Sequence, residues 1–274
     1  MSPVTKVVIT GAAGNLGSKL RRHFEQLGWS LALLDVSNAG DAAIEVADLA
    51  HWDERWVGRF AEADAVVHLA GDPSPSASWA AIQRLNIDLL FNVYEAAARQ
   101  GARRLIFASS NWVVAGERFG EGPLREDAAP SPVNAYGASK LVGERLGRSY
   151  SERGSLSVIC FRIGYCQRGV NEPGPRMGYG LWGQRMWLSD RDLCQGFEKA
   201  VLAPAQLRFA VLNLMSRNDG MRWDLDAARK SIGYVPLDRF TPIETDALKT
   251  QAAAAANAHV LATAANAFIQ GQRW

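Results

Sequence analysis

Residues 10–17 read TGAAGNLG, and this stretch decides the fold. Before it, the β-branched run at 4–10 predicts a strand. After it, apolar residues recur from Leu16 to Leu27 at spacings of four, four and three, which is typical of one face of a helix. A TGxxGxxG pattern between a strand and an amphipathic helix predicts a turn that binds the pyrophosphate of a dinucleotide.

The glycines suit this task for physical reasons. Gly11 and Gly14 permit a tight turn and a close approach of the backbone to a phosphate, and Gly17 lets the helix pack against the sheet. The first helical N–H groups and the positive end of the helix dipole then point at the anion. We therefore predict that Gly11, Gly14, Asn15, Leu16 and Gly17 bind a dinucleotide, although such glycines can also serve only to shape a turn.

Asp35 ends the second apolar run, 18 residues after Gly17. A carboxylate there accepts hydrogen bonds from ribose hydroxyls and repels a 2′-phosphate. No arginine follows it directly, so the sequence favours NAD over NADP, with a simple turn residue as the alternative. We include Val36 in this site, and we predict that Asp48 and Leu49, after the third apolar run, contact the adenine.

Strand-like and helix-like segments alternate along the chain. This order predicts an α/β fold, a Rossmann-like doubly wound parallel sheet. Uninterrupted apolar runs support it, because helices then cover both faces of the sheet. The expected strands lie at 4–10, 29–36, 43–49, 65–70, 104–108 and 156–163, and the expected helices at 16–27, 53–61, 79–100 and 136–153.

After Gly164 the pattern changes. A loop rich in glycine and proline at 169–183 is a natural place to bind substrate. Residues 1–164 are thus predicted to bind the cofactor, and a small carboxyl-terminal region, 165–274, to bind substrate within the same structural unit. This region is expected to hold helices at 190–202 and 224–232, a strand at 209–214 and an alanine-rich helix from Gln251 that packs on the body or on another copy.

Composition excludes several other classes of protein. The 274 residues contain 30 Lys+Arg and 28 Asp+Glu, a net charge of +2, so no strong attraction to nucleic acid or to an anionic membrane is expected. Cys160, Cys166 and Cys194 lack metal or disulfide spacing, and the four histidines are scattered, so we expect no metal site. No leader-like or membrane-spanning apolar stretch is evident, which favours a cytoplasmic protein.

The stretch YGASK at 136–140 carries the predicted chemistry. A spacing of four places Tyr136 and Lys140 on one helical face, where the ammonium is expected to lower the pKa of the phenol and make it a general base. YxxxK alone is common and mostly structural. Ser110, at the carboxyl edge of the predicted sheet, adds a hydroxyl that could bind the reacting oxygen.

These motifs together resemble the extended short-chain dehydrogenase/reductase superfamily, also called the NAD-dependent epimerase/dehydratase superfamily. Within it, the chain resembles uronate dehydrogenases, which oxidise C1 of a hexuronic acid to an aldarolactone with NAD. The stretches that carry the resemblance are TGAAGNLG, Asp35, Asp48-Leu49, HLAG at 68–71, ASSN at 108–111, YGASK, Arg162-Ile163-Gly164 and WLSDRD at 187–192.

The resemblance implies roles for individual residues. Tyr136 would be the base, Lys140 its modulator and a ligand of the cofactor ribose, and Ser110 and Asn111 would contact the substrate. The main chain at Leu69, Ala70, Gly71, Ile163 and Cys166 would line the cofactor. Analogy with the fold suggests a homodimer or homotetramer.

The sequence departs from uronate dehydrogenases where the sugar is bound. Trp112 replaces the usual histidine and Tyr165 the usual serine, and Pro73 stands where a polar residue is expected. We predict that Trp112 and Tyr165 reshape the pocket. Arg176, or alternatively Arg185, is predicted to bind an anionic group at C6, a carboxylate or a sulfonate, with a solvated loop arginine as the alternative.

Two other functions stay open at this point. A sugar-nucleotide epimerase or dehydratase shares the motifs, but usually has a larger carboxyl-terminal region; a non-catalytic dinucleotide sensor often lacks the tyrosine or the lysine. Among single residues, His68 is expected in the core and Cys166 in packing. Ser189 is expected to start a helix, and Asn86 to hold a kink or contact the catalytic neighbourhood.

Overall fold

In the computed structural model, which describes residues 5–271 and the side chains of residues 5–259, seven strands form one sheet. Every pairing is parallel, and the order is β3-β2-β1-β4-β5-β6-β7. The predicted Rossmann-like α/β fold is therefore confirmed. The strands are β1 (Lys6–Thr10), β2 (Ser30–Asp35), β3 (Ile44–Val46), β4 (Ala65–His68), β5 (Arg104–Ser110), β6 (Ser157–Ile163) and β7 (Phe209–Leu214).

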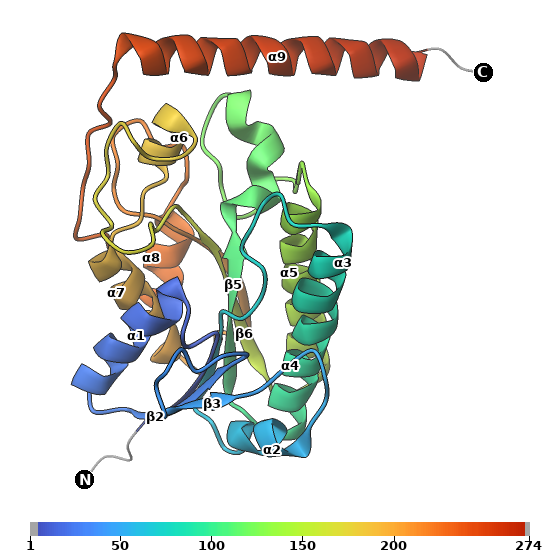
Figure 1. Cartoon of the computed structure of the whole chain (residues 1–274), viewed down its shortest axis with the longest axis vertical. Helices are drawn as coiled ribbons and strands as arrows, with labels where there is room; N and C mark the ends of the chain where they lie inside the picture. Colours follow the sequence, from blue (N-terminus) through green and yellow to red (C-terminus); the bar gives the residue numbers. More distant parts are fainter. Residues whose placement is uncertain (1–4, 272–274) are drawn as a thin grey trace.

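Helices cover both faces of this sheet (Figure 1), with α1, α7 and α8 on one face and α3, α4 and α5 on the other. Val7 and Ile9 of β1 pack into the core on the α1 side, while Val8 packs on the α4 side. This is why the strand needs an uninterrupted apolar run. The helices are α1 (Asn15–Gln26), α2 (Glu54–Val57), α3 (Trp79–Ile82), α4 (Leu89–Arg99), α5 (Ala135–Arg153), α6 (Gly180–Arg185), α7 (Asp190–Val201), α8 (Asp226–Ile232) and α9 (Asp246–Gly271).

Four central strands end at one edge of the sheet. In the register, Thr10 of β1 pairs with His68 of β4, and Ser110 of β5 pairs with Ile163 of β6. The chain order reverses between β1 and β4, since β1 has β2 on its other side. Ligands of doubly wound sheets bind in the crevice outside the carboxyl ends of strands at such a switch point.

Four predicted elements differ from the observed ones. The helix expected at 79–100 contains a π-helical segment, η2 (Gln83–Asp88), between α3 and α4. The strand expected at 104–108 continues to Ser110, and a 3₁₀ segment, η3 (Asn111–Phe119), follows it. A short helix, α6, begins within the predicted loop. The helix expected at 53–61 is α2 followed by the 3₁₀ turn η1 (Gly58–Phe60).

The carboxyl-terminal region adds β7 to the edge of the sheet, beside β6. A third apolar cluster, which includes Val113, Met186 and Trp223, joins η3 to this region. The alanine-rich tail is helical as predicted, and α9 lies across one end of the molecule near α6 (Figure 1). Within residues 5–271, no helix is both long enough and apolar enough to span a membrane.

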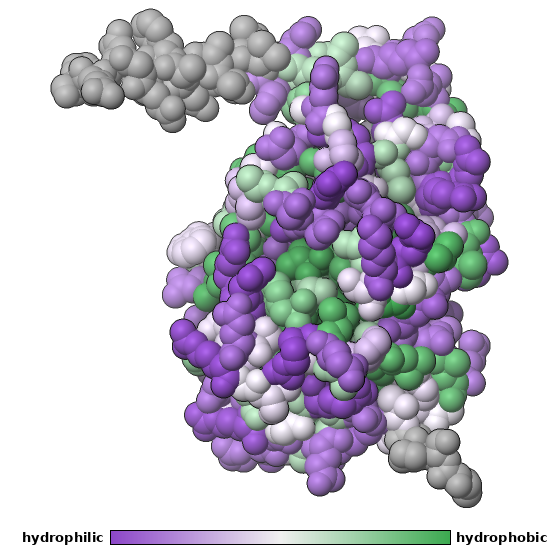
Figure 2. Space-filling model, turned by 180° about the vertical axis from the view of Figure 1, so that it is seen from behind, coloured by the Kyte–Doolittle hydropathy of each residue, from purple (hydrophilic) through white to green (hydrophobic). Residues whose placement is uncertain are grey.

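A hollow is visible near the middle of the opposite side of the molecule (Figure 2). Hydrophobic residues form its floor, and hydrophilic residues surround it. An apolar concavity with a polar rim is the usual form of a small-molecule site.

Candidate active site

A cavity of about 520 Å³ lies at the carboxyl edge of the sheet. Its wall is formed by the turns that follow β1 and β4, by the first residues of α1 and α5, by the ends of β2, β5 and β6, and by the segment after β6. All sixteen residues predicted to bind the cofactor lie on its wall, namely Gly11, Gly14, Asn15, Leu16, Gly17, Asp35, Val36, Asp48, Leu49, Leu69, Ala70, Gly71, Tyr136, Lys140, Ile163 and Cys166.

The glycine turn has no room for side chains. Gly11 has a φ of +73°, and a Cβ on it would lie 2.7 Å from the amide nitrogen of Ala70. A Cβ on Gly17 would lie 2.2 Å from the carbonyl oxygen of Gly11. Helix α1 starts after Gly14 with no side-chain cap and no acidic residue in its first turn. Its free N–H groups therefore suit a diphosphate.

Asp35 is also placed for a dinucleotide. Its Oδ2 accepts a hydrogen bond from the backbone N–H of Ala13, at 2.9 Å, which fixes the carboxylate beside the glycine turn. Asp48 lines the same end of the cavity and forms an ion pair with Arg84. Asn15 donates to the carbonyl of Cys166, at 3.0 Å, and so joins the turn to the segment after β6. The carboxylates of Asp35 and Asp48, together with the glycine turn, fit the adenosine half and the diphosphate of NAD.

Tyr136 and Lys140 project from the first turns of α5 into the cavity. The Asn134 side chain caps this helix by accepting from the N–H of Gly137, at 2.7 Å. The Lys140 ammonium lies 5.5 Å from the centre of the Tyr136 ring and 5.0 Å from that of Phe107. Ser110 forms a hydrogen bond with the phenol and lines the same cavity.

Burial, and not Lys140, dominates the titration of the phenol. It raises the pKa of Tyr136 to about 12, although the hydrogen bond with Ser110 acts in the opposite direction. Burial also lowers the pKa of Lys140 to about 8. The prediction that the ammonium lowers the pKa of Tyr136 is therefore wrong for the protein alone, because desolvation disfavours both charged forms.

Two buried polar residues hold the neighbourhood of α5. His68 is 1% exposed and forms a 2.7 Å hydrogen bond with the Thr10 hydroxyl, so its predicted place in the core is confirmed. The Asn86 amide accepts from the N–H of Asp72, at 2.7 Å, and donates to the Ser139 hydroxyl, at 3.2 Å. The π segment thus turns Asn86 toward α5, and its predicted contact with the neighbourhood of Tyr136 and Lys140 is confirmed.

Sequence reasoning missed one buried ion pair. Glu144, one turn after Lys140, accepts two hydrogen bonds from Arg162 of β6, both at 2.9 Å, and a third from the hydroxyl of Ser109, at 2.7 Å. The two charged side chains are 4% and 3% exposed. The pair fixes α5 against the ends of β5 and β6. Only the glutamate's place one turn after the YxxxK lysine could have indicated it.

Aromatic side chains form the other end of the cavity. The ring of Tyr179 lies 5.6 Å from that of Trp112 and 6.0 Å from that of Tyr165, both in edge-to-face geometry. Asn111 also lines this end, and its amide donates to the carbonyl of Ile163, at 2.9 Å. We call Trp112, Tyr165 and Tyr179 the aromatic wall.

The predicted anion contacts lie outside this cavity. Arg176 is exposed and lines no described cavity. Arg185 lines a second, smaller cavity and pairs with Glu244 at 3.4 Å. Arg168 is the arginine on the wall of the large cavity. The spacing of the three arginines along the chain could not show which of them lines the large cavity, because that depends on how the segment before α6 folds.

Cys166 and Ser189 contribute to packing and helix capping. Burial raises the pKa of the Cys166 thiol to about 12, in keeping with its predicted packing role. The Ser189 hydroxyl caps α7 by accepting from the N–H of Asp192, at 3.0 Å, as predicted. No group of three potential metal ligands occurs among the described residues.

The chain matches the model of the NAD dependent epimerase/dehydratase family over residues 7–165. The chain belongs to this family. An NAD-dependent glucose-6-phosphate dehydrogenase of Haloferax volcanii is 35% identical to this epimerase/dehydratase family member, over 85% of this chain and 93% of the relative. An L-arabinose 1-dehydrogenase of the same organism is 32% identical, over 86% and 97%.

Comparison with solved structures also finds a sugar dehydrogenase. A mutant uronate dehydrogenase from Agrobacterium tumefaciens, complexed with NAD, is 30% identical to this family member, with a TM-score of 0.72 over 86% of each chain. The predictions of the superfamily, of an NAD-dependent oxidoreductase and of NAD as cofactor are confirmed.

Proposed function

We propose that this chain oxidises the C1 hydroxyl of a cyclic monosaccharide to a lactone, with transfer of hydride to NAD. The observation that carries the proposal is the single cavity that joins the glycine turn to Tyr136 and Ser110 and then to the aromatic wall. The relatives named above are dehydrogenases of a sugar, a sugar phosphate and a uronate.

In this proposal, each residue near C1 has one task. Tyr136 removes the proton from the C1 hydroxyl, and Ser110 donates a hydrogen bond that fixes the oxygen. Lys140, one helical turn away on the same face of α5, binds the cofactor ribose. Bound NAD supplies a hydride acceptor at C4 of its nicotinamide ring.

The proposed NAD site uses the residues described above. The glycine turn and the start of α1 would bind the diphosphate, and Asp35 and Asp48 would lie near the adenosine half. When NAD and the sugar are both held at fixed positions, the reaction no longer has to bring two free molecules together, which lowers its entropic cost.

The aromatic wall supports a sugar as the substrate. Aromatic rings present an apolar face to the C–H groups of a pyranose, and the hydroxyls of Tyr165 and Tyr179 can bind its oxygens. An acidic sugar, a uronate or a sulfonated hexose, is the proposed substrate class. The homo-oligomeric state and the cytoplasmic location remain predictions.

A panel of sugars tests the proposal. Neutral aldoses, uronates, sugar 6-phosphates and 6-sulfonates are incubated with enzyme and NAD, and NADH is followed by absorbance. We expect NADH to accumulate in amounts equal to the lactone formed. An epimerase recycles its cofactor, so isomerisation of a sugar nucleotide without accumulation of NADH would reject the proposal.

A further inference from the structure

A second cavity, of about 120 Å³, lies next to the aromatic wall, between η3, α6 and α9. Among the described residues, its wall contains two arginines, a glutamine and no carboxylate. Tyr179 lines both cavities. The residues that line the smaller cavity are Arg118, Phe119, Tyr179, Gly180, Leu181, Trp182, Arg185, Leu248, Gln251 and Ala252.

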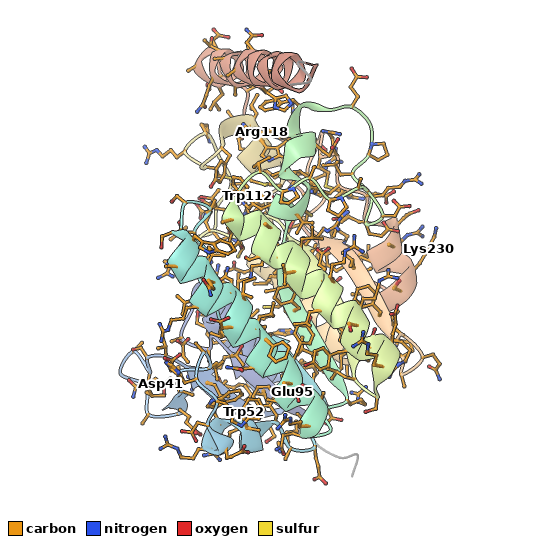
Figure 3. All side chains as sticks on the ribbon, turned by 90° about the vertical axis from the view of Figure 1, so that its right-hand side faces the viewer. Asp41, Trp52, Glu95, Trp112, Arg118 and Lys230 are labelled. Atoms are coloured by element: carbon orange, nitrogen blue, oxygen red, sulfur yellow. The ribbon has the colours of Figure 1, made fainter. Side chains whose placement is uncertain are left out.

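Arg118 lies in the wall of this cavity. Among the described side chains it has no ion pair and no hydrogen bond, and its guanidinium packs 5.0 Å from the centre of the Phe119 ring and 6.0 Å from that of Trp182. Figure 3 shows it near α9, farther from the sheet than Trp112. Burial lowers its pKa, yet a guanidinium stays charged at neutral pH. A partly desolvated charge of this kind is unfavourable unless an anion joins it.

Arg185 and Gln251 line the same cavity. The Nε of Arg185 is buried and has no partner, while its Nη2 has only the 3.4 Å contact with Glu244. The Gln251 side chain lies over Gly180, where an added Cβ would be 2.9 Å from its Oε1. Buried donors without acceptors are rare in folded proteins, and ligands commonly satisfy them.

We propose that this cavity binds a compact oxyanion through Arg118 and Arg185. Two guanidinium groups offer planar, charged donors that match phosphate, sulfonate or carboxylate oxygens. A site needs about 10–15 Å³ to hold one water molecule, so a cavity of about 120 Å³ has room for a compact oxyanion. The oxyanion can be free in solution, or it can be the end of the sugar remote from C1.

Phosphate binding to the full-length protein tests this site. Inorganic phosphate is titrated calorimetrically at constant ionic strength, with NAD saturating so that the dinucleotide site is filled. We expect one phosphate per chain, and Arg118→Gln should raise its Kd at least about tenfold. Arg118→Lys should recover part of the affinity, because it restores the charge without the planar fork.

Arg176→Gln is the matched control, since Arg176 lies on the same loop region but lines neither cavity. It should bind phosphate as the wild type does. Thermal unfolding of each variant in chloride shows whether it is folded. No saturable binding to the wild type, or equal Kd values for the wild type and a folded Arg118→Gln variant, would overturn the proposal.

Kinetics separate the two sources of the anion, and this part alone depends on the proposed function. If the anion belongs to the substrate, phosphate competes with an anionic sugar, and Arg118→Gln raises KM for that sugar and not for a neutral one. If the anion is free, phosphate binds without competition. Either result supports the site, and phosphate binding without any sugar turnover would reject the proposed function alone.

Discussion

At the scale of single residues, Tyr136 experiences two opposite influences in one pocket. Burial raises the pKa of its phenol to about 12, while the hydrogen bond with Ser110 favours the phenolate. Lys140 is itself partly discharged, since burial lowers its pKa to about 8. In the protein alone the phenol is thus mostly protonated at neutral pH, and only a small fraction of it is available as a base.

Tyr136→Phe should reduce kcat by about 10²–10⁴-fold, the usual contribution of a general base. The Kd for NAD should change less than about threefold, because the glycine turn is untouched. Stopped assays and NAD titration measure the two quantities. Tyr179→Phe, which removes a hydroxyl from the aromatic wall, is the control and should cost less than about tenfold in kcat. A Tyr136→Phe enzyme with wild-type kcat would contradict the assignment.

The pH dependence of kcat/KM follows from the same shift. A phenol whose pKa lies above the assay range is mostly protonated, so the fraction of base grows with pH. Between pH 6 and 8 we expect kcat/KM to rise, up to about tenfold per pH unit. Initial rates at low sugar concentration measure it. A flat or falling profile would show that Tyr136 does not act as the base.

At the scale of elements, α5 is held by charge as well as by packing. Its first turns carry the candidate catalytic pair, and Glu144 joins it through Arg162 and Ser109 to β6 and β5. Three elements that carry the site therefore meet at one buried carboxylate. Loss of one partner of a buried ion pair leaves the other charge without compensation.

Glu144→Gln should destabilise the protein by about 3–5 kcal/mol, because Arg162 stays buried without its counter-charge. Urea unfolding measures the free energy. Glu152→Gln is the matched control on the same helix: its 3.8 Å pair with Arg148 is exposed, so the change should be below about 0.5 kcal/mol. Equal stability of the two variants would show that the buried pair contributes nothing.

At the scale of the whole molecule, His68 couples acid to unfolding. Burial first, and the charge of Lys140 second, lower its pKa to about 3. The unfolded chain takes up this proton near pH 6.5, whereas the folded protein does so only near pH 3. In that window the unfolded state binds more protons, so the free energy of unfolding falls as the pH falls.

The expected slope from His68 is up to about 1.4 kcal/mol per pH unit between pH 6 and 4. Urea unfolding at several pH values measures it. His68→Gln should reduce the slope by this amount, while His51→Gln, which changes a histidine with 78% of its side chain exposed, should leave it unchanged. A slope that is the same in His68→Gln and the wild type would contradict the prediction.

The sequence alone was enough for the parts of this protein that are local. TGAAGNLG and YGASK each place their key residues within one turn or one strand–helix unit, so spacing determines geometry. Alternating apolar runs were likewise enough for the parallel sheet, because each strand must be apolar on both faces.

Only the tertiary structure decided which distant residues meet. Glu144 and Arg162 come together because α5 packs on β6, and Arg118 lies beside Gln251 because α9 returns to η3 and α6. It also placed Arg176 outside the cavity, although its sequence context favoured a substrate contact. The energy of such contacts depends on burial and on packing between elements, and neither is encoded in the spacing of residues along one segment.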